Sequence, residues 1–366
     1  MLQKPGAYSG QIWQRFKKNK LALAALIVIA VATFCAIFAY WIVPDNSPNA
    51  DFQTVEIQAK KPGYRQTFLQ IPNGNSAVDN PFHILLFGKK QSYQLIPINS
   101  YQIAGDSLVV QKYVDEDTTI MQSYFIPSIL KKNKNISSNI IAKKYRLGTD
   151  TYGRDILSRI ILGTRVSLAV GFIAVIISLG IGILFGAVAG YFGGHTDKLL
   201  MWFLNVTWSI PTLLLVFAIT IAMGKGFWQI FTAVGLTMWV NVARLVRGQV
   251  MVLKEMEYVQ AAKVLGFSHA RIIVKHILPN IMGPLMVMAA ANFATAIIIE
   301  AGLSFLGLGI QPPHTSWGLM IKENYNFVIT NNPMLALAPG IAIMLMVLAF
   351  NLLGNALSDA MDVKSL

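Results

Sequence analysis

The residue patterns that could support catalysis or nucleotide binding are incomplete in this sequence. A phosphate-binding loop needs the spacing Gly-x-x-x-x-Gly-Lys-Ser/Thr, and the Gly-Lys segments at 88–90 and 224–226 lack the upstream glycine and the hydroxyl. The five histidines show no metal-ligand spacing and no catalytic serine context. The single cysteine, Cys35, lies in an apolar run and cannot form an internal disulfide. We therefore predict no catalytic residue, no metal site, no bound cofactor and no ATPase site in this chain.

Polar residues inside apolar stretches are the next candidates, because an unpaired polar group is costly in a bilayer. Glu300 is the only acid inside a predicted span and lies near the end of that span. Two roles stay open for it, namely packing or hydrogen bonding, which we favour, and direct contact with a substrate. The same choice between packing and lining a pathway applies to Asn205, Ser209, Pro211, Asn241 and Asn292.

The most specific pattern lies at residues 257–280. Residues 257–265 predict a short amphipathic helix, and Gly266 either ends that helix or lets another backbone approach closely. Residues 267–277 predict a second helical piece, and Pro279 marks a turn into the next apolar span. A helix–glycine–helix unit between two spans is suited to docking in a groove on a partner, although the pattern alone also fits a surface loop.

The elements that must position these residues are long apolar segments. The chain is 54% hydrophobic and only 13% charged, with a mean hydropathy of +0.53, which indicates a membrane protein. A helix needs about 20 mostly apolar residues to cross the hydrocarbon core. Six stretches meet that need and predict an all-α polytopic membrane protein: residues 21–43, 166–190, 199–223, 228–246, 281–306 and 334–355. The first is too long for a signal peptide and has no small-x-small cleavage site.

Basic residues predict the orientation of these spans. They cluster before the first span (Lys4, Arg15, Lys17, Lys18, Lys20) and between the fourth and fifth (Arg244, Arg247, Lys254, Lys263, Arg271, Lys275). The short loops on the opposite side hold only Lys225 and Lys322. The positive-inside rule therefore predicts that both termini and the 257–280 loop are cytoplasmic. The net charge of +13 follows these membrane sides, and we predict no nucleic-acid binding.

Residues 44–146 predict a small β-rich extracytoplasmic insertion. Strands are expected at Gln53–Gln58 and Ser107–Val114, and turns at 72–74 and 104–106. A platform for a soluble partner and an insertion without separable activity both stay open. Within the membrane, Gly182, Gly186 and Gly190 predict close helix packing, while Pro211 and Pro339 predict broken helices.

The 257–280 segment resembles the coupling motif of importer permeases of the ATP-binding-cassette (ABC) superfamily, which is Glu-Ala-Ala, three residues, Gly, nine residues and Ile-x-Leu-Pro. Gln260-Ala261-Ala262, Gly266 and Leu278-Pro279 match it, whereas Gln260 replaces the usual acid and His276 the usual isoleucine. The segments 147–159, 189–194, 303–318 and 348–354 are similar to the dipeptide/oligopeptide/nickel branch, closest to its C-type permease subunit. The resemblance covers residues 1–43 and 147–366, leaving 44–146 largely outside.

This resemblance implies a type I ABC importer permease fold in a bacterial cytoplasmic membrane. Residues 1–43 would hold the cytoplasmic N-terminus and the first helix, and 147–366 the other five, with the coupling loop at 250–280. Implied partners are a second, homologous permease, two ABC ATPase subunits that use ATP and Mg²⁺, and an extracytoplasmic substrate-binding protein. The implied ATPase-coupling residues are Glu257, Gln260, Ala261, Ala262, Gly266, His276, Leu278 and Pro279.

The implied substrate is a di- or oligopeptide, with nickel or another peptide-like solute as the alternative. A secondary transporter is the chief rival, but it predicts paired charges at mid-membrane and inverted repeats, and Glu300 is the only candidate charge. A membrane sensor or scaffold would not need the 257–280 loop.

Overall fold

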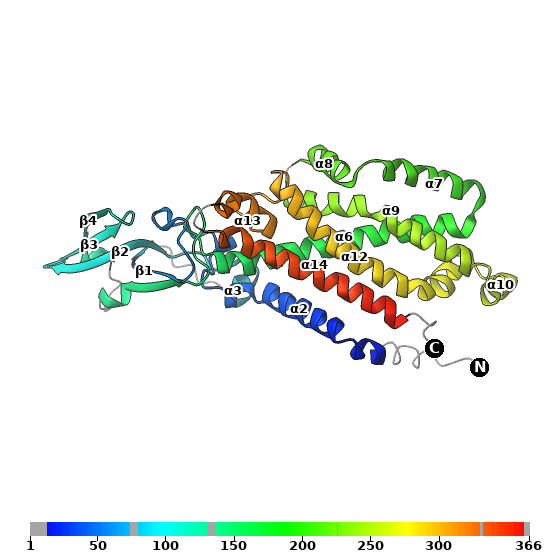
Figure 1. The fold of residues 1–366 in the computed structure, drawn as a ribbon, viewed down its shortest axis with the longest axis horizontal. Helices are drawn as coiled ribbons and strands as arrows, with labels where there is room; N and C mark the ends of the chain where they lie inside the picture. Colours follow the sequence, from blue (N-terminus) through cyan, green and yellow to red (C-terminus); the bar gives the residue numbers. More distant parts are fainter. Residues whose placement is uncertain (1–12, 74–79, 130–135, 225, 330–331, 362–366) are drawn as a thin grey trace. The chain divides into compact units, whose positions relative to one another are not determined.

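The computed structural model describes residues 13–73, 80–129, 136–224, 226–329 and 332–361 (Figure 1). Lys4, Lys225 and part of the predicted turn at 72–74 lie outside these residues. The chain divides into two compact units, which we describe separately. The first unit comprises residues 1–33, 167–311 and 343–366, and the second comprises 34–166 and 312–342. Three of the four boundaries fall within long helices, α2 (Lys20–Ile37), α6 (Ile156–Phe192) and α14 (Met334–Met361), and the fourth falls between helices, at Gln311–Pro312.

The first unit is helical. Besides its parts of α2, α6 and α14, it contains α7 (Gly194–Ser209), α8 (Thr212–Met223), α9 (Phe227–Leu253), α10 (Glu257–Val264), α11 (His269–Ile272), η4 (Ile273–Ile277), η5 (Leu278–Ile281) and α12 (Met282–Phe305). Among the described residues, five helical segments are long and apolar enough to cross a membrane, and six if the bent pair α7–α8 forms one span. The predicted number of spans is therefore confirmed when that pair is counted.

The third span is sharply broken. The axes of α7 and α8 differ by 92° at Ile210–Pro211. Proline has no N–H to donate and disfavours helical geometry in the residue before it, and Ile210 is accordingly extended, with ψ at 126°. The predicted break at Pro211 is confirmed, and the span predicted over 199–223 corresponds to the bent pair α7–α8.

Close packing joins α6 to α9. The three glycines predicted to form a contact stripe all face α9, where side chains would not fit. A Cβ on Gly190 would lie 2.7 Å from the carbonyl oxygen of Arg247. A Cβ on Gly182 would lie 2.9 Å from that of Trp239. The stripe thus brings two backbones together, as small residues do between helices in lipid.

Three predicted helix boundaries differ from the structure. The first span does not run unbroken to Val43, because α2 ends at Ile37 and a separate turn, α3 (Ala39–Ile42), follows. Pro339 does not break its helix, since α14 starts at Met334 and a proline within its second turn removes only one backbone hydrogen bond. Pro279 does not mark a turn either. The helical path runs from His269 to Phe305, and it loosens to π geometry in η4 just before the proline.

The second unit contains an antiparallel sheet of five strands, in the order β4-β3-β2-β1-β5 (Figure 1). The strands are β1 (Tyr64–Pro72), β2 (Tyr93–Ala104), β3 (Ser107–Tyr113), β4 (Thr119–Phe125) and β5 (Ile140–Tyr145). The short helical elements are α3, α4 (Pro81–Phe87), α5 (Ile126–Ile129), α13 (Trp317–Asn324), η1 (Pro48–Ala50), η2 (Val55–Ile57), η3 (Ile136–Asn139) and η6 (Tyr325–Val328). One face of the sheet buries Leu69, Ile98, Leu108 and Val110 with Ile129 of α5.

The β-rich insertion predicted for 44–146 is confirmed. The strand at Ser107–Tyr113 and the turn at Gly105, whose φ is +59°, lie where the sequence places them. The strand predicted at Gln53–Gln58 is wrong, because Val55–Ile57 form a 3-10 turn. The alternating pattern of apolar and polar residues was misleading here. Ile57 is fully buried beside Phe68 and Tyr145, but a turn places it there and not the pleat of a strand.

Candidate functional site

Helix α10, the first half of the 257–280 loop, is anchored by its inner face. Val259 and Ala262 are buried in one apolar cluster with Val246 and Val250 of α9 and Ile272 of α11. Ala262 is 3% exposed, so its small side chain serves packing within this chain. Ala261, the neighbouring residue, is exposed, so of the two predicted coupling alanines only Ala261 lies on the surface of this chain.

The outer face of the loop is unusually apolar. Val264 is 88% and Leu265 72% exposed, at the end of α10, although both are large aliphatic side chains. Gly266 follows with φ at +75°, and a Cβ there would meet nothing within 4 Å in this chain. Of the two roles left open for Gly266, ending the helix in a left-handed conformation is the one its geometry supports. Sequence reasoning missed Val264 and Leu265, because exposure cannot be read from an apolar residue alone.

The two positions that depart from the coupling motif make contacts inside the loop. The side-chain amide of Gln260 donates to the carbonyl of Lys254 at 2.8 Å, so it closes the connection between α9 and α10. His276 stacks on Phe267, with ring centroids 5.9 Å apart and planes 15° apart. Arg271 covers the same Phe267 ring at 4.2 Å. Both departures therefore stabilise the helix–glycine–helix shape rather than disturb it.

The rest of the predicted coupling set lies at both ends of the loop. Glu257 is exposed in the first turn of α10, where a carboxylate interacts favourably with the helix dipole. Leu278 packs against the buried cluster, and Pro279 is exposed. The Asn280 amide donates to the carbonyl of His276 at 2.7 Å and to the Tyr258 hydroxyl at 3.3 Å, which ties α10 to η5, just before α12.

A further contact joins the loop to α6. The Tyr191 hydroxyl and the Nδ1 atom of His269 lie 3.0 Å apart, and the Lys263 ammonium lies 5.7 Å from the Tyr191 ring centroid. Tyr191 belongs to the same buried cluster as Val259. The sequence singled out residues 189–194 but assigned them no role, because this partnership spans 78 positions in the chain.

The predicted pathway residues fall into two groups, and the first is exposed on the helical unit. Asn205 accepts a 2.7 Å hydrogen bond from Arg244, whose guanidinium lies 4.0 Å from the Trp208 ring centroid. Asn241 is exposed one turn before Arg244, and its side chain makes no hydrogen bond to the side chains of the described residues. Ser209 and Pro211, also exposed, form the break between α7 and α8, where the Ser209 hydroxyl donates to the Val206 carbonyl at 2.7 Å.

The second group is buried. The Asn292 amide donates to the Ser178 hydroxyl at 3.3 Å between α12 and α6. Glu300 is fully buried and accepts a 2.7 Å hydrogen bond from the Ser304 hydroxyl, which in turn accepts the Ile310 N–H at 3.2 Å. Glu300 thus lies where it can fix the turn after α12, and the structure does not bring it together with the exposed group.

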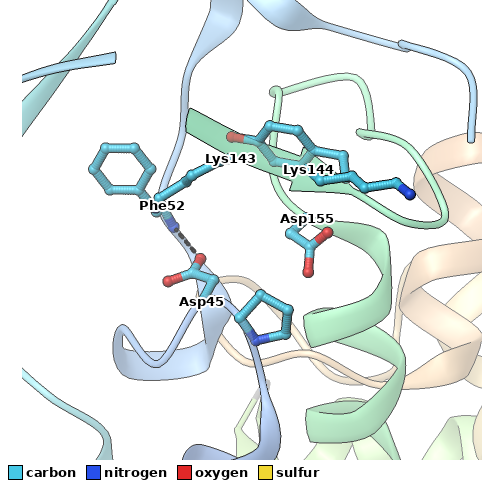
Figure 2. A pocket seen from close by; sticks show the side chains of 7 residues that line it. Asp45, Phe52, Lys143, Lys144 and Asp155 are labelled. Atoms are coloured by element: carbon cyan, nitrogen blue, oxygen red, sulfur yellow. Dashed lines mark hydrogen bonds between the residues drawn. The ribbon is translucent and has the colours of Figure 1, made fainter. Parts of the chain in front are cut away.

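A pocket of about 200 Å³ lies in the second unit, beside the N-terminal end of α6 (Figure 2). Its two carboxylates already have local partners. Asp45 accepts the N–H groups of Ser47 at 3.0 Å and Phe52 at 3.3 Å, and Asp155 accepts the Ser158 N–H at 2.9 Å. Burial raises the pKa of Asp155 and lowers that of Lys143, which also lines the pocket. The acids hold a loop and a helix start, and we assign the pocket no ligand.

These features define a polytopic membrane protein with a packed helical loop, apolar on its exposed side, between two spans, and comparisons of sequence give its family. The family described as "Binding-protein-dependent transport system inner membrane component" matches residues 182–364. The N-terminal transmembrane domain of oligopeptide transport permease C matches residues 8–61. The chain belongs to this family: it is a multi-pass inner-membrane permease subunit of a binding-protein-dependent ABC importer.

Similar proteins agree with this assignment. The oligopeptide transport system permease protein OppC of Bacillus subtilis is 40% identical over 223 residues, covering 61% of this chain and 73% of its own. The glutathione transport system permease protein GsiD of Pectobacterium atrosepticum is 42% identical over 218 residues, covering 60% and 72%. The dipeptide transport system permease protein DppC of Lactococcus lactis is 30% identical over 353 residues, covering 96% and 90%. That last alignment extends over most of residues 44–146, so the expectation that resemblance is largely lacking there does not hold for this relative, whereas the other two alignments cover about three fifths of the chain.

Among solved structures, a chain of the MetNI methionine ABC transporter aligns with 57% of this chain and 98% of its own, at 16% identity and a TM-score of 0.46. The family assignment rests on the sequence matches, and with it the type I ABC importer permease fold.

Proposed function

We propose that this permease carries di- or oligopeptides. The observation that supports peptides best is the set of similar permeases, whose names specify oligopeptide, dipeptide and glutathione transport, all of them peptides or peptide-like. Nickel or another peptide-like solute is the alternative, and no similar protein cited above is named for nickel. A secondary transporter is disfavoured by family membership, because these importers depend on a binding protein.

In this proposal the chain forms half of a translocation pathway with a second, homologous permease. Two ABC ATPase subunits bind and hydrolyse ATP with Mg²⁺, and this chain binds no cofactor itself. Both termini and the coupling loop (250–280) face the cytoplasm, and residues 44–146 face outward to the substrate-binding protein. The excess of Lys and Arg before α2 and around α10 supports this orientation.

The exposed face of the 257–280 loop is the proposed ATPase contact. Val264 and Leu265 form an exposed apolar surface, and Glu257 and Ala261 extend this exposed surface along α10. Contiguous exposed apolar surface is a mark of protein–protein contact sites, and these two adjacent side chains form such a surface at the end of α10. Gln260, Ala262, His276 and Leu278 act behind that surface by fixing the shape of the loop.

The exposed polar group is the proposed lining of the pathway. Asn205, Asn241 and Arg244 lie on neighbouring turns of α7 and α9, and polar groups facing hydrocarbon would be costly. Exposure of Asn205 and Asn241 in a single subunit, beside the half-buried Arg244, favours a water-filled path shared with the second permease. Asn292 and Glu300 have buried partners, and we propose structural roles for them.

Uptake by the reconstituted complex tests the substrate. We expect labelled di- or oligopeptide to accumulate in proteoliposomes only with ATP and the binding protein, and unlabelled peptides to compete. Free amino acids and nickel salts serve as matched competitors. Competition by a nickel chelate but not by peptides would replace peptide with nickel, and uptake without ATP would favour secondary transport.

A further inference from the structure

A buried cluster of charged residues in the second unit has no part in the functions described above. Its members come from four places in the chain, and they are Asp51 after η1, Asp150 and Arg154 before α6, Arg159 in the first turn of α6, and Glu323 in α13. The Arg159 side chain is 1% and the Arg154 side chain 4% exposed. Burial on this scale requires that each charge be paired.

The pairing is dense and links α13 to α6. Arg159 donates to Asp150 at 2.6 Å and to Glu323 at 2.8 Å. Arg154 donates to Asp150 at 2.7 Å and to the same Glu323 oxygen at 2.7 Å, and it also reaches Asp51 at 3.1 Å. Glu323 is thus the one carboxylate of α13 that receives both arginines, 164 and 169 positions away in the chain.

Neutral contacts hold the same elements together. The Trp317 indole N–H donates to the Ile160 carbonyl at 3.0 Å, and a Cβ on Gly163 would lie 2.9 Å from the Trp317 ring. The Thr315 hydroxyl donates to the Asn49 carbonyl at 3.0 Å, and the Asn332 amide reaches the Lys60 carbonyl at 3.1 Å. The first residues of the outer segment, the start of α6 and the α13 region are therefore fastened to each other at several points.

Electrostatics make the cluster sensitive to the loss of one charge. Two guanidinium groups face three carboxylates, and the Nε atom of Arg159 has no hydrogen-bond partner in the described part of the chain. Burial lowers the pKa of Arg154, whereas the charges of Asp150 and Glu323 raise it. The net shift of this pKa is upward. Removing Glu323 would take a buried hydrogen-bond acceptor away from each arginine, and buried donors that lose their acceptor are costly.

We propose that Glu323, Arg154 and Arg159 are positioning residues that clamp α13 to the outer segment and to the start of α6. The clamp makes these elements one body, so that a binding protein docked on the outer segment acts on α13 and hence on α14, which follows it in the chain. Substrate transfer needs the clamp, whereas assembly with the ATPase subunits does not. This inference rests on the role of the chain as an importer permease and is independent of which solute it carries.

The test compares Glu323→Gln with Lys322→Gln in the complete reconstituted importer. Lys322 is the neighbouring charge on α13 and has no hydrogen bond or ion pair to the described residues, so it is the matched control. For Glu323→Gln we expect complex yield and basal ATPase activity to match wild type. Uptake and the stimulation of ATPase by loaded binding protein should fall about tenfold, within the range known for coupling between sites. Lys322→Gln should leave all four quantities unchanged.

Three results would overturn the clamp: normal uptake by Glu323→Gln, loss of uptake only in proportion to lost complex, or equal loss of basal and stimulated ATPase activity. If Glu323→Gln fails to assemble, Arg159→Lys decides, because it keeps the charge but loses the forked donor geometry. Its uptake per assembled complex should be reduced, and a normal value would refute the proposal. Wild-type complex that takes up a solute other than peptide would correct the proposed substrate and leave the clamp intact.

Discussion

Replacing Gly186 with alanine measures how tightly α6 and α9 pack. A Cβ on Gly186 would lie 2.8 Å from the Val246 Cβ and overlap the Ala243 carbonyl oxygen, so the helices must separate. Overpacking of this kind costs about 1–3 kcal/mol. Gly→Ala within a helix gains about 1 kcal/mol from propensity, which offsets part of that cost. Gly180→Ala is the matched control, because a Cβ there meets nothing within 4 Å on the same helix.

Because the propensity gain is the same in both variants, their difference isolates packing. We expect Gly186→Ala to be less stable than Gly180→Ala by about 1–3 kcal/mol, and Gly180→Ala to be no less stable than wild type. Denaturant titration of the purified chain in detergent micelles gives the free energies, with fluorescence of the buried Trp239 as a local probe. Equal stability of the two alanine variants would refute the close approach of α6 to α9.

Three other predictions follow from single sites. At Gly266, whose φ is +75°, asparagine should support more uptake than alanine because asparagine adopts the left-handed region more easily. Aspartate at this position should abolish uptake without blocking membrane insertion. Equal uptake by the alanine variant and wild type would contradict the need for a left-handed conformation at this residue. Burial raises the pKa of Asp155, so this carboxyl contributes stability at low pH that is lost as the pH rises through its raised folded-state pKa. Asp155→Asn should therefore flatten the fall of thermal stability as the pH rises above the ordinary carboxyl range, and an unchanged pH profile would count against it. Ser304→Ala removes a donor to Glu300 and the acceptor of the Ile310 N–H. It should lower the free energy of unfolding by about 1–3 kcal/mol in the same denaturant titration. Wild-type stability of this variant would show that other contacts hold the turn after α12.

Hydropathy and local chemistry predicted much of the membrane part. Apolar length is a local property, so the spans are visible in the sequence, and the Ile210–Pro211 break follows from proline geometry alone. The helix over Glu257–Val264 and its end before Gly266 are equally local. The ends of helices were less predictable. A proline breaks a helix or is tolerated according to its distance from the first turn, and the sequence did not show that α14 starts close enough to Pro339 for the helix to continue.

Contacts between distant residues were beyond sequence reasoning. Ala261 and Ala262 are adjacent and chemically identical, and only the packing of α10 on α9 decides that one is exposed and the other buried. Asp150 and Arg154 suggest an ion pair by their spacing of four, but nothing local identifies Glu323 as the shared partner. Ile57 shows the same limit, because tertiary burial overrode an alternating pattern that favoured a strand.

Affinity purification of the tagged chain in mild detergent tests the central claim most directly. We expect a homologous permease and P-loop ATPases to co-purify in near-stoichiometric amounts, and the ATPases to be lost when the exposed Val264 and Leu265 are both replaced by aspartate. Purification of the wild-type chain alone or as a homo-oligomer, with no ATPase, would contradict the coupling role of this loop.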